Sequence, residues 1–324
     1  MAETKRFLSL DDLTHMPKPT WAIEGLFERN SLVMLAGPPA SYKSFMALDW
    51  ILSMAIGRKW MNRDTTSAKI LYILGEGKAS LLKRIQVWCH YHQITNEEKN
   101  KLVSNFRVTF DVPQMAMKSS VDNMLSGLNA EGYTPDVIVV DTFARSFVGL
   151  DENSQKDTGL WIESADRLRQ LGYTVIFLHH TAKNTEFGLK YRGSTAIMGA
   201  MDTAMVMDKD YQNPTKVVMK ITKQKDHDEG NPMFFNRLVI KPDGHDDEGS
   251  IILIPAPAAV DERFTAEGQA IETTIKKLLD DESFDSDRAR ARELSRKFPQ
   301  LTESAAHSRI VRRKREAGPD EPVH

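Results

Sequence analysis

The chain has 324 residues, of which 41% are hydrophobic and 27% charged, a composition typical of a globular protein with a sizeable core. It has no apolar run near the ~18 residues that a membrane span needs and no hydrophobic signal region in residues 1–12, so we expect a cytoplasmic protein without a membrane partner. The one cysteine, Cys89, excludes an internal disulfide and a cysteine-rich zinc site. The net charge of −2 confines any nucleic-acid contact to local basic patches or to several subunits together.

Residues 1–20 are polar and predict an N-terminal arm, and residues 21–254 alternate short apolar strands with amphipathic helices. This alternation predicts an α/β core with a mostly parallel, twisted sheet covered on both faces. The last strands have little helix between them and are expected to add antiparallel at the sheet edge. We expect strands at 32–36, 70–74, 106–109, 137–141, 174–178, 203–207, 216–222 and 237–240, and helices at 44–56, 78–93, 121–130 and 157–171.

The first strand runs into a candidate phosphate-binding loop, Gly37-Pro38-Pro39-Ala40-Ser41-Tyr42-Lys43-Ser44, followed by a helix. In such a loop the backbone N–H groups and the helix N-terminus bind phosphate oxygens, Lys43 would reach the β- and γ-phosphates of ATP, and Ser44 would bind Mg²⁺. Tyr42 stands where the GxxxxGK[ST] consensus has a second glycine, a position where glycine is favoured for unusual backbone dihedrals. The alternative interpretation is an ordinary strand-to-helix turn.

Three further strands end in side chains suited to phosphate chemistry. Asp141 ends an apolar strand, as in the Walker B motif, where its carboxylate would bind Mg²⁺ or a magnesium-bound water. Glu76 follows the strand at 70–74, where it would polarise the attacking water or, alternatively, cap the next helix. His179 and His180 follow the strand at 174–178, and either would donate to the γ-phosphate. Adjacent residues of a strand point to opposite faces, so the pair is unsuited to chelating a metal.

Two basic segments follow. Residues 184–199 are polar and glycine-rich, contain Lys190 and Arg192, and predict a mobile loop. Lys223 and Lys225 end a strand two residues apart and therefore share a face. They would either reach a neighbouring subunit's nucleotide as phosphate-stabilising cations or lie on a solvated hairpin tip, and the sequence leaves both interpretations open.

Residues 255–265 are predicted to form a linker, and a basic helical module is predicted at residues 266–324. Helices are predicted at 266–280, 287–297 and 302–315. Asp285 or Ser286 would cap the second helix and Thr302 the third.

The end of this module is strongly basic. Residues 286–316 contain ten Lys or Arg and four acids, a net charge of +6 that leaves −8 for the rest of the chain. Three helices with a basic last one resemble a helix-turn-helix or winged-helix module, in which Arg309, Arg312 and Arg313 would bind DNA or a partner. A charged, solvated tail is the alternative.

The motifs GPPASYKS, LYILGEG, VIVVDT, FLHHTAK, YRGST and ITKQK, in this order, resemble the RecA-like ATPases of the DnaB class, in particular the RepA-type plasmid helicases and their phage relatives. The resemblance covers about residues 21–240. It implies a homo-hexameric ring with ATP and Mg²⁺ at subunit interfaces and single-stranded DNA in the central channel.

By position, the resemblance makes Lys43 and Ser44 the phosphate and magnesium residues, Glu76 the catalytic glutamate and Asp141 the Walker B aspartate. His179 or His180 lies at the phosphate-sensing motif. Lys190 and Arg192 lie in the DNA-facing loop, and Lys223 and Lys225 match the trans-acting pair, where the family carries Lys and Arg. The basic helical module lies outside the resemblance.

The leading hypothesis is an ATP-dependent DNA motor, a replicative helicase of plasmid or phage type that acts with a separate primase or an initiator protein. A recombination or repair ATPase on single-stranded DNA is an alternative, distinguished by an open filament rather than a closed ring. A nucleotide-switched DNA-binding regulator with little turnover is the third hypothesis.

Overall fold

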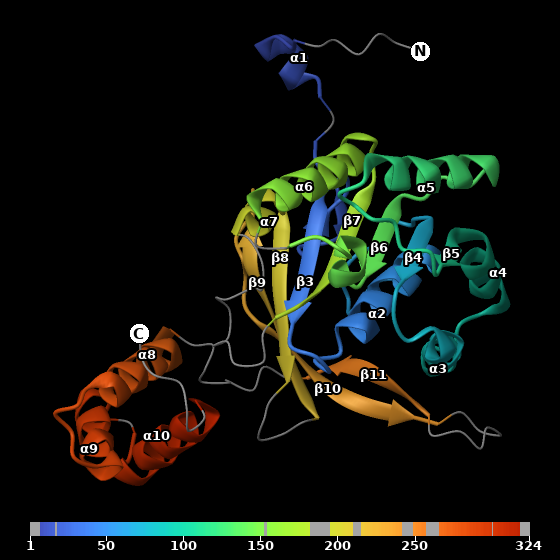
Figure 1. Ribbon diagram of the computed structural model, residues 1–324. Coiled ribbons are helices and arrows are strands. Elements are labelled where there is room, and N and C mark those ends of the chain that lie inside the picture. Colours follow the sequence, from blue (N-terminus) through green and yellow to red (C-terminus); the bar gives the residue numbers. More distant parts are fainter. Residues whose placement is uncertain are drawn as a thin grey trace.

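The computed structural model describes residues 7–16, 18–151, 154–181, 195–209, 215–241, 249–256, 266–299 and 301–317. Within these ranges the chain forms an α/β core followed by three helices (Figure 1). No helix in the described ranges is both long and apolar enough to cross a membrane.

The core is built on a sheet of nine described strands in the order β11-β10-β9-β8-β3-β7-β6-β4-β5. Strands β8, β3, β7, β6, β4 and β5 run parallel, and β9, β10 and β11 continue the sheet antiparallel. The central strands consist of buried apolar residues, as expected for parallel strands covered on both faces. Their bounds are β3 Leu32–Gly37, β4 Ile70–Leu74, β5 Phe106–Thr109, β6 Val137–Asp141, β7 Thr174–His180, β8 Thr203–Lys209, β9 Lys216–Gln224, β10 Met233–Ile240 and β11 Ser250–Pro255.

Helices cover both faces of this sheet (Figure 1). On one face α2, α3 and α4 share a core that includes Trp50 and Trp60. On the other face α5, α6, α7 and the short helix η2 pack around Phe143, Trp161 and Phe177. The bounds are α2 Lys43–Ile56, α3 Leu81–Tyr91, α4 Asn96–Asn105, α5 Lys118–Ala130, η2 Phe143–Phe147, α6 Gln155–Gln170 and α7 Thr195–Ala200.

The predicted α/β class, the parallel sheet and the antiparallel additions are confirmed. All eight predicted strands and four predicted core helices are present, with ends that differ by at most four residues. The prediction omitted α4, whose polar sequence lacks apolar periodicity and whose start is marked by a capping box between Thr95 and Glu98. It also omitted β11, η2 and the small elements α1 Leu10–Thr14, β1 Trp21–Ile23 and β2 Phe27–Glu28. The helix predicted at 78–93 divides into η1 Lys78–Ser80 and α3, and the loop predicted at 184–199 is wrong at its end, where α7 begins.

The predicted linker begins too early. Pro255 is the last residue of β11, and the N–H of Ala256 donates to the carbonyl of Phe234, so both residues belong to the sheet. The rest of the predicted linker, 257–265, lies outside the described residues.

The three predicted C-terminal helices are confirmed as α8 Ala266–Asp280, α9 Asp287–Lys297 and α10 Glu303–Ala317. They enclose a hydrophobic core of their own, with Ile275, Leu294 and Ile310 fully buried. Ser286, rather than Asp285, caps α9, because its side chain accepts from the N–H of Ala289. Thr302 accepts from the N–H of Ala305 and caps α10 as predicted.

Candidate nucleotide-binding site

The loop between β3 and α2 has the geometry of a phosphate-binding loop. Lys43 begins α2, and its Nζ curls back to donate to the carbonyls of Gly37 at 2.8 Å and Pro38 at 2.9 Å. A side chain at Gly37 would collide with the backbone of Met207 and with Ser41, which explains the glycine. Burial lowers the pKa of Lys43 to about 8, opposed by the charges of Asp141 and Asp208. A desolvated cation at a helix N-terminus is suited to binding an anion.

Tyr42 occupies the second glycine position in a left-handed conformation, with φ 68° and ψ 20°. This is the unusual backbone conformation expected at that position, and a non-glycine residue adopts it at a cost of about 1–2 kcal/mol. The ring lies edge-on to Phe45, with centroids 6.2 Å apart, and packs against the core on the α2 face. This packing holds the ring of Tyr42 in the strained loop.

Asp141 is held beside the start of α2. Because β3, β7, β6 and β4 are parallel, the ends of these strands meet at one edge of the sheet. Asp141 accepts hydrogen bonds from Ser44 and, at 2.7 Å, from the hydroxyl of Tyr72. Burial raises the pKa of Asp141, whereas these hydrogen bonds and the charges of Arg84 and Lys43 oppose the shift.

The donor set fits a magnesium ion shared with a nucleotide. Ser44 and Asp141 present oxygen ligands side by side, and Mg²⁺ in phosphate sites takes one or two protein oxygens with phosphates and waters. Among the described residues no group of three or more His, Cys, Asp or Glu side chains forms a dedicated metal site.

Glu76 lies one strand away from Asp141, directly after β4. Its Oε1 pairs with Nε of Arg145 at 3.1 Å, and both side chains are about half exposed. The N–H of Gly75 donates to the carbonyl of Asp141 at 2.6 Å, so the segment that carries Glu76 is fixed to the end of β6. The predicted alternative, that Glu76 caps the next helix, is wrong, because Gly77 precedes η1.

The two histidines at the end of β7 have different surroundings. His180 Nδ1 lies 3.3 Å from Lys43 Nζ, and burial followed by the Lys43 charge lowers the pKa of His180. His179 is buried on the opposite face, with its ring 4.8 Å from that of Phe143. His180 therefore lies beside the phosphate-binding loop, and His179 packs in the core.

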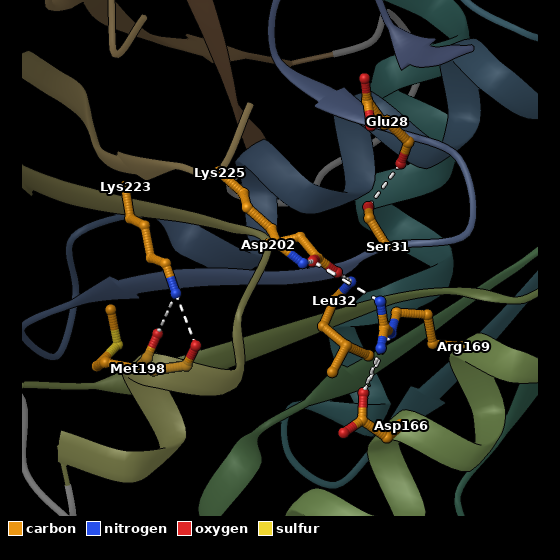
Figure 2. A network of polar contacts seen from close by, with 10 residues as sticks. Glu28, Ser31, Leu32, Asp166, Arg169, Met198, Asp202, Lys223 and Lys225 are labelled. Carbon is orange, nitrogen blue, oxygen red and sulfur yellow. Dashed lines mark hydrogen bonds and ion pairs between the residues drawn. The ribbon is translucent and has the colours of Figure 1, made fainter. Parts of the chain in front are cut away.

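Lys223 and Lys225 lie near the start of β3, at the opposite end of the parallel strands from the phosphate-binding loop. Figure 2 shows Lys223 directed at Met198 and Lys225 directed at Asp202. Lys223 Nζ donates to the carbonyls of Met198 at 3.0 Å and Gly199 at 2.7 Å, and burial lowers its pKa. Lys225 pairs with Asp202 at 3.6 Å. Asp202 in turn accepts from the N–H of Leu32 at 2.9 Å.

Lys223 and Lys225 lie far from the phosphate-binding loop of their own chain, as the sheet register shows. Leu32 begins β3 and Gly37 ends it, and five residues of parallel strand span about 17 Å. The alternative of a solvated hairpin tip is wrong for Lys223, because its ammonium group is bound to the end of α7.

The remaining predicted site residues are the basic residues expected to bind DNA. Lys190 and Arg192 lie outside the described residues, as does most of the loop expected to face DNA. Arg309 and Arg313 are partly buried on α10, and the side chain of Arg312 is outside the described part.

Three residues near the site were not assigned a role from the sequence. Arg145 pairs with Glu76. Burial lowers the pKa of Lys43, and the charge of Asp208 in β8 opposes this shift. Arg84 of α3 stacks over the ring of Phe45, 4.6 Å from its centroid. The register of β8 beside β3 is the only signal that would have placed Asp208 there, and it appears only after folding.

Comparison with known proteins identifies the class. Residues 2–186 match the AAA_25 family, described as an AAA domain. The match spans more than half of the chain, so the chain belongs to this family. The match establishes the family, and the strand order establishes an α/β fold with a largely parallel sheet. No curated protein matches the sequence.

Two solved structures are among those that match this chain. The RadB recombinase is 16% identical with a TM-score of 0.46, covering 64% of this chain and 87% of its own. A KaiC-like protein from the hyperthermophilic archaeon Pyrococcus horikoshii OT3 is 16% identical with a TM-score of 0.48, covering 72% of this chain and 94% of its own.

Proposed function

We propose that the protein hydrolyses ATP as an oligomer and uses the energy to translocate on single-stranded DNA, as a replicative helicase of plasmid or phage type. The proposal rests chiefly on one observation. The phosphate-binding loop and the lysine pair lie at opposite ends of the parallel strands, so a site that uses both needs two subunits. A head-to-tail interface of this kind closes into a ring when the rotation between subunits allows it.

Each residue has a proposed part in the reaction. Lys43 and the backbone N–H groups at the start of α2 bind the phosphates of ATP, and Ser44 and Asp141 hold Mg²⁺, whose charge neutralises phosphate oxygens when it is bound. Glu76 accepts a proton from the attacking water, with Arg145 holding its carboxylate. His180, next to Lys43, senses the terminal phosphate.

The lysine pair acts on the neighbouring subunit. Lys223 and Lys225 stabilise the charge that develops on the transferred phosphoryl group, as cations supplied in trans do in other ATPases. An ammonium group lacks the planar fork of arginine, so we expect slower hydrolysis than an arginine would support. Because Lys223 also binds the end of α7, which follows the predicted DNA loop, the neighbour's nucleotide would be coupled to DNA.

The first test measures steady-state ATP hydrolysis with and without single-stranded DNA, with particle mass from light scattering. We expect DNA-stimulated turnover by a closed, roughly hexameric particle. Slow, DNA-independent turnover by a monomer or dimer would contradict the proposal. Unwinding of a forked duplex then separates the helicase from a recombination or repair ATPase, whose open filament would coat the strand without unwinding it.

The catalytic assignment is tested with Glu76→Gln. It should retain ATP binding and lose hydrolysis by ~10²-fold or more, because the base is removed without a large change in shape. Glu131→Gln on the exposed end of α5 is the matched control and should behave as wild type. Near-normal turnover in Glu76→Gln would assign the base to another residue.

A further inference from the structure

The C-terminal helices form a well-defined corner. Ser295 Oγ donates to the carbonyl of Leu301 at 2.6 Å, and the N–H of Leu301 donates to the carbonyl of Phe298 at 2.9 Å, so Leu301, just before α10, is bound to the last turn of α9 and to the residue that follows α9. Ala291 and Ala306 are buried in the module's core, where their small side chains allow close packing. Two helices fixed at such a turn are the framework of a helix-turn-helix.

Charge is segregated within this module. Residues 266–285, which form α8 and the connection to α9, contain six acids and two lysines, a net charge of −4. Residues 286–316, which include α9 and most of α10, carry +6. The net charge of the α9–α10 segment is therefore the one suited to a polyanion, whereas that of the α8 segment would repel it.

The two halves of α10 carry different kinds of side chain. Its first half presents short polar side chains, with Ser304 and Ser308 exposed and His307 partly exposed. Its second half carries the basic residues of the sequence from Arg309 onward. In a recognition helix, the N-terminal residues contact base edges and basic residues contact phosphates, so this order suits a helix that enters the major groove.

The module favours a duplex over a single strand. Proteins that bind single strands use exposed aromatic side chains on which bases stack. The aromatic residues of 266–317 are Phe284 and Phe298, and both pack against the module's core. An α-helix with its side chains is about 10–12 Å wide, which matches the major groove of DNA.

We propose that the α9–α10 face binds duplex DNA, with the first half of α10 in the major groove. Ser304, His307 and Ser308 face the base edges, and the basic residues of α9 and α10 bind the flanking phosphates. This binding is separate from the nucleotide site and does not depend on the function proposed for that site. A Lys43→Ala protein is expected to retain it.

The test compares two substitutions that introduce the same charge on different helices. Ser308 and Thr274 are both helix-surface hydroxyls that donate to the carbonyl four residues earlier, one on α10 and the other on α8. Fluorescence anisotropy of a labelled 20-bp duplex is measured with the full chain at several salt concentrations. Ser308→Glu should weaken duplex binding about tenfold through repulsion by phosphates, and Thr274→Glu should change it less than twofold.

Two further measurements make the test decisive. Ser304→Glu places an acid in the first turn of α10, where a negative charge favours the helix, so its loss of duplex binding cannot be attributed to unfolding. A single strand of the same length is measured in parallel. Equal duplex affinity in Ser308→Glu and Thr274→Glu would overturn the proposal. An equal loss on single-stranded DNA would also overturn it and would assign the face to single strands instead.

Discussion

Gly75 lies where the side chain of Arg145 crosses the backbone after β4, and replacing it with alanine should disturb the candidate catalytic carboxylate. A Cβ at Gly75 would lie 2.8 Å from Cγ and 3.0 Å from Cβ of Arg145. Ordinary contacts begin at 3.4 Å, so the stem of Arg145 must move by about 0.6 Å. The Arg145–Glu76 pair, at 3.1 Å, would then lengthen.

The expected result is a kinetic defect without loss of nucleotide binding. A displacement of 1 Å in a catalytic group lowers a rate by about 10²-fold, so a shift of half that size predicts a fall in kcat of about tenfold with KM changed less than twofold. The assay is steady-state ATP hydrolysis, with thermal unfolding as a check on the fold. Gly127→Ala is the matched control, because a Cβ there meets nothing within 4 Å.

A double-substitution cycle tests whether the effect passes through Arg145. If Gly75→Ala acts by displacing Arg145, the combination with Arg145→Ala should be no slower than Arg145→Ala alone. Additive losses in the double variant, or unchanged turnover in Gly75→Ala, would refute the reasoning.

Three other predictions concern binding, stability and the two histidines. Lys43→Ala should abolish nucleotide binding, measured by calorimetry, and unchanged ATP affinity would refute the site. Asp49 accepts hydrogen bonds from the indoles of Trp60 at 2.7 Å and Trp88 at 2.6 Å, and burial raises its pKa to about 6 from 3.8, so the folded protein holds its proton more tightly than the unfolded chain. The stabilisation that this bound proton provides is therefore lost as pH rises from about 4 to 6, and the unfolding free energy of Asp49→Asn should gain about 2 kcal/mol relative to wild type between pH 4 and pH 7 in urea titrations; a constant difference would contradict this. His180→Ala should lower turnover while keeping the melting temperature, whereas His179→Ala should mainly lower the melting temperature, and the reverse pattern would exchange their roles.

The sequence predicted those parts of the fold that leave a local pattern. Buried strands such as β6 and β7 are continuous apolar runs, and the ends of parallel strands meet at one edge, so Lys43, Asp141 and Glu76 were placed together correctly. Thr302 was identified, and Ser286 was one of two candidates with Asp285, because N-cap chemistry is local.

The parts that the sequence did not predict depend on contacts between distant residues. The pairing of Arg145 with Glu76 requires η2 to fold back over Gly75, 70 residues earlier in the chain. The choice between His179 and His180 depends on which face of β7 meets α2. α4 lacks the apolar periodicity on which helix prediction depends, because Leu102 is its one residue in the described hydrophobic core on the α2 face.

Mixing two inactive variants tests the shared site most directly. Lys43→Ala removes the phosphate-binding lysine, and Lys223→Ala removes a cation that is proposed to act on the neighbouring subunit. At equal mixing, half of the interfaces join subunits of different type, and in half of these an intact loop meets an intact cation, so about a quarter of wild-type ATP hydrolysis should return. Hydrolysis that stays at the level of the separate variants, although mixed oligomers form, would contradict a site shared between subunits.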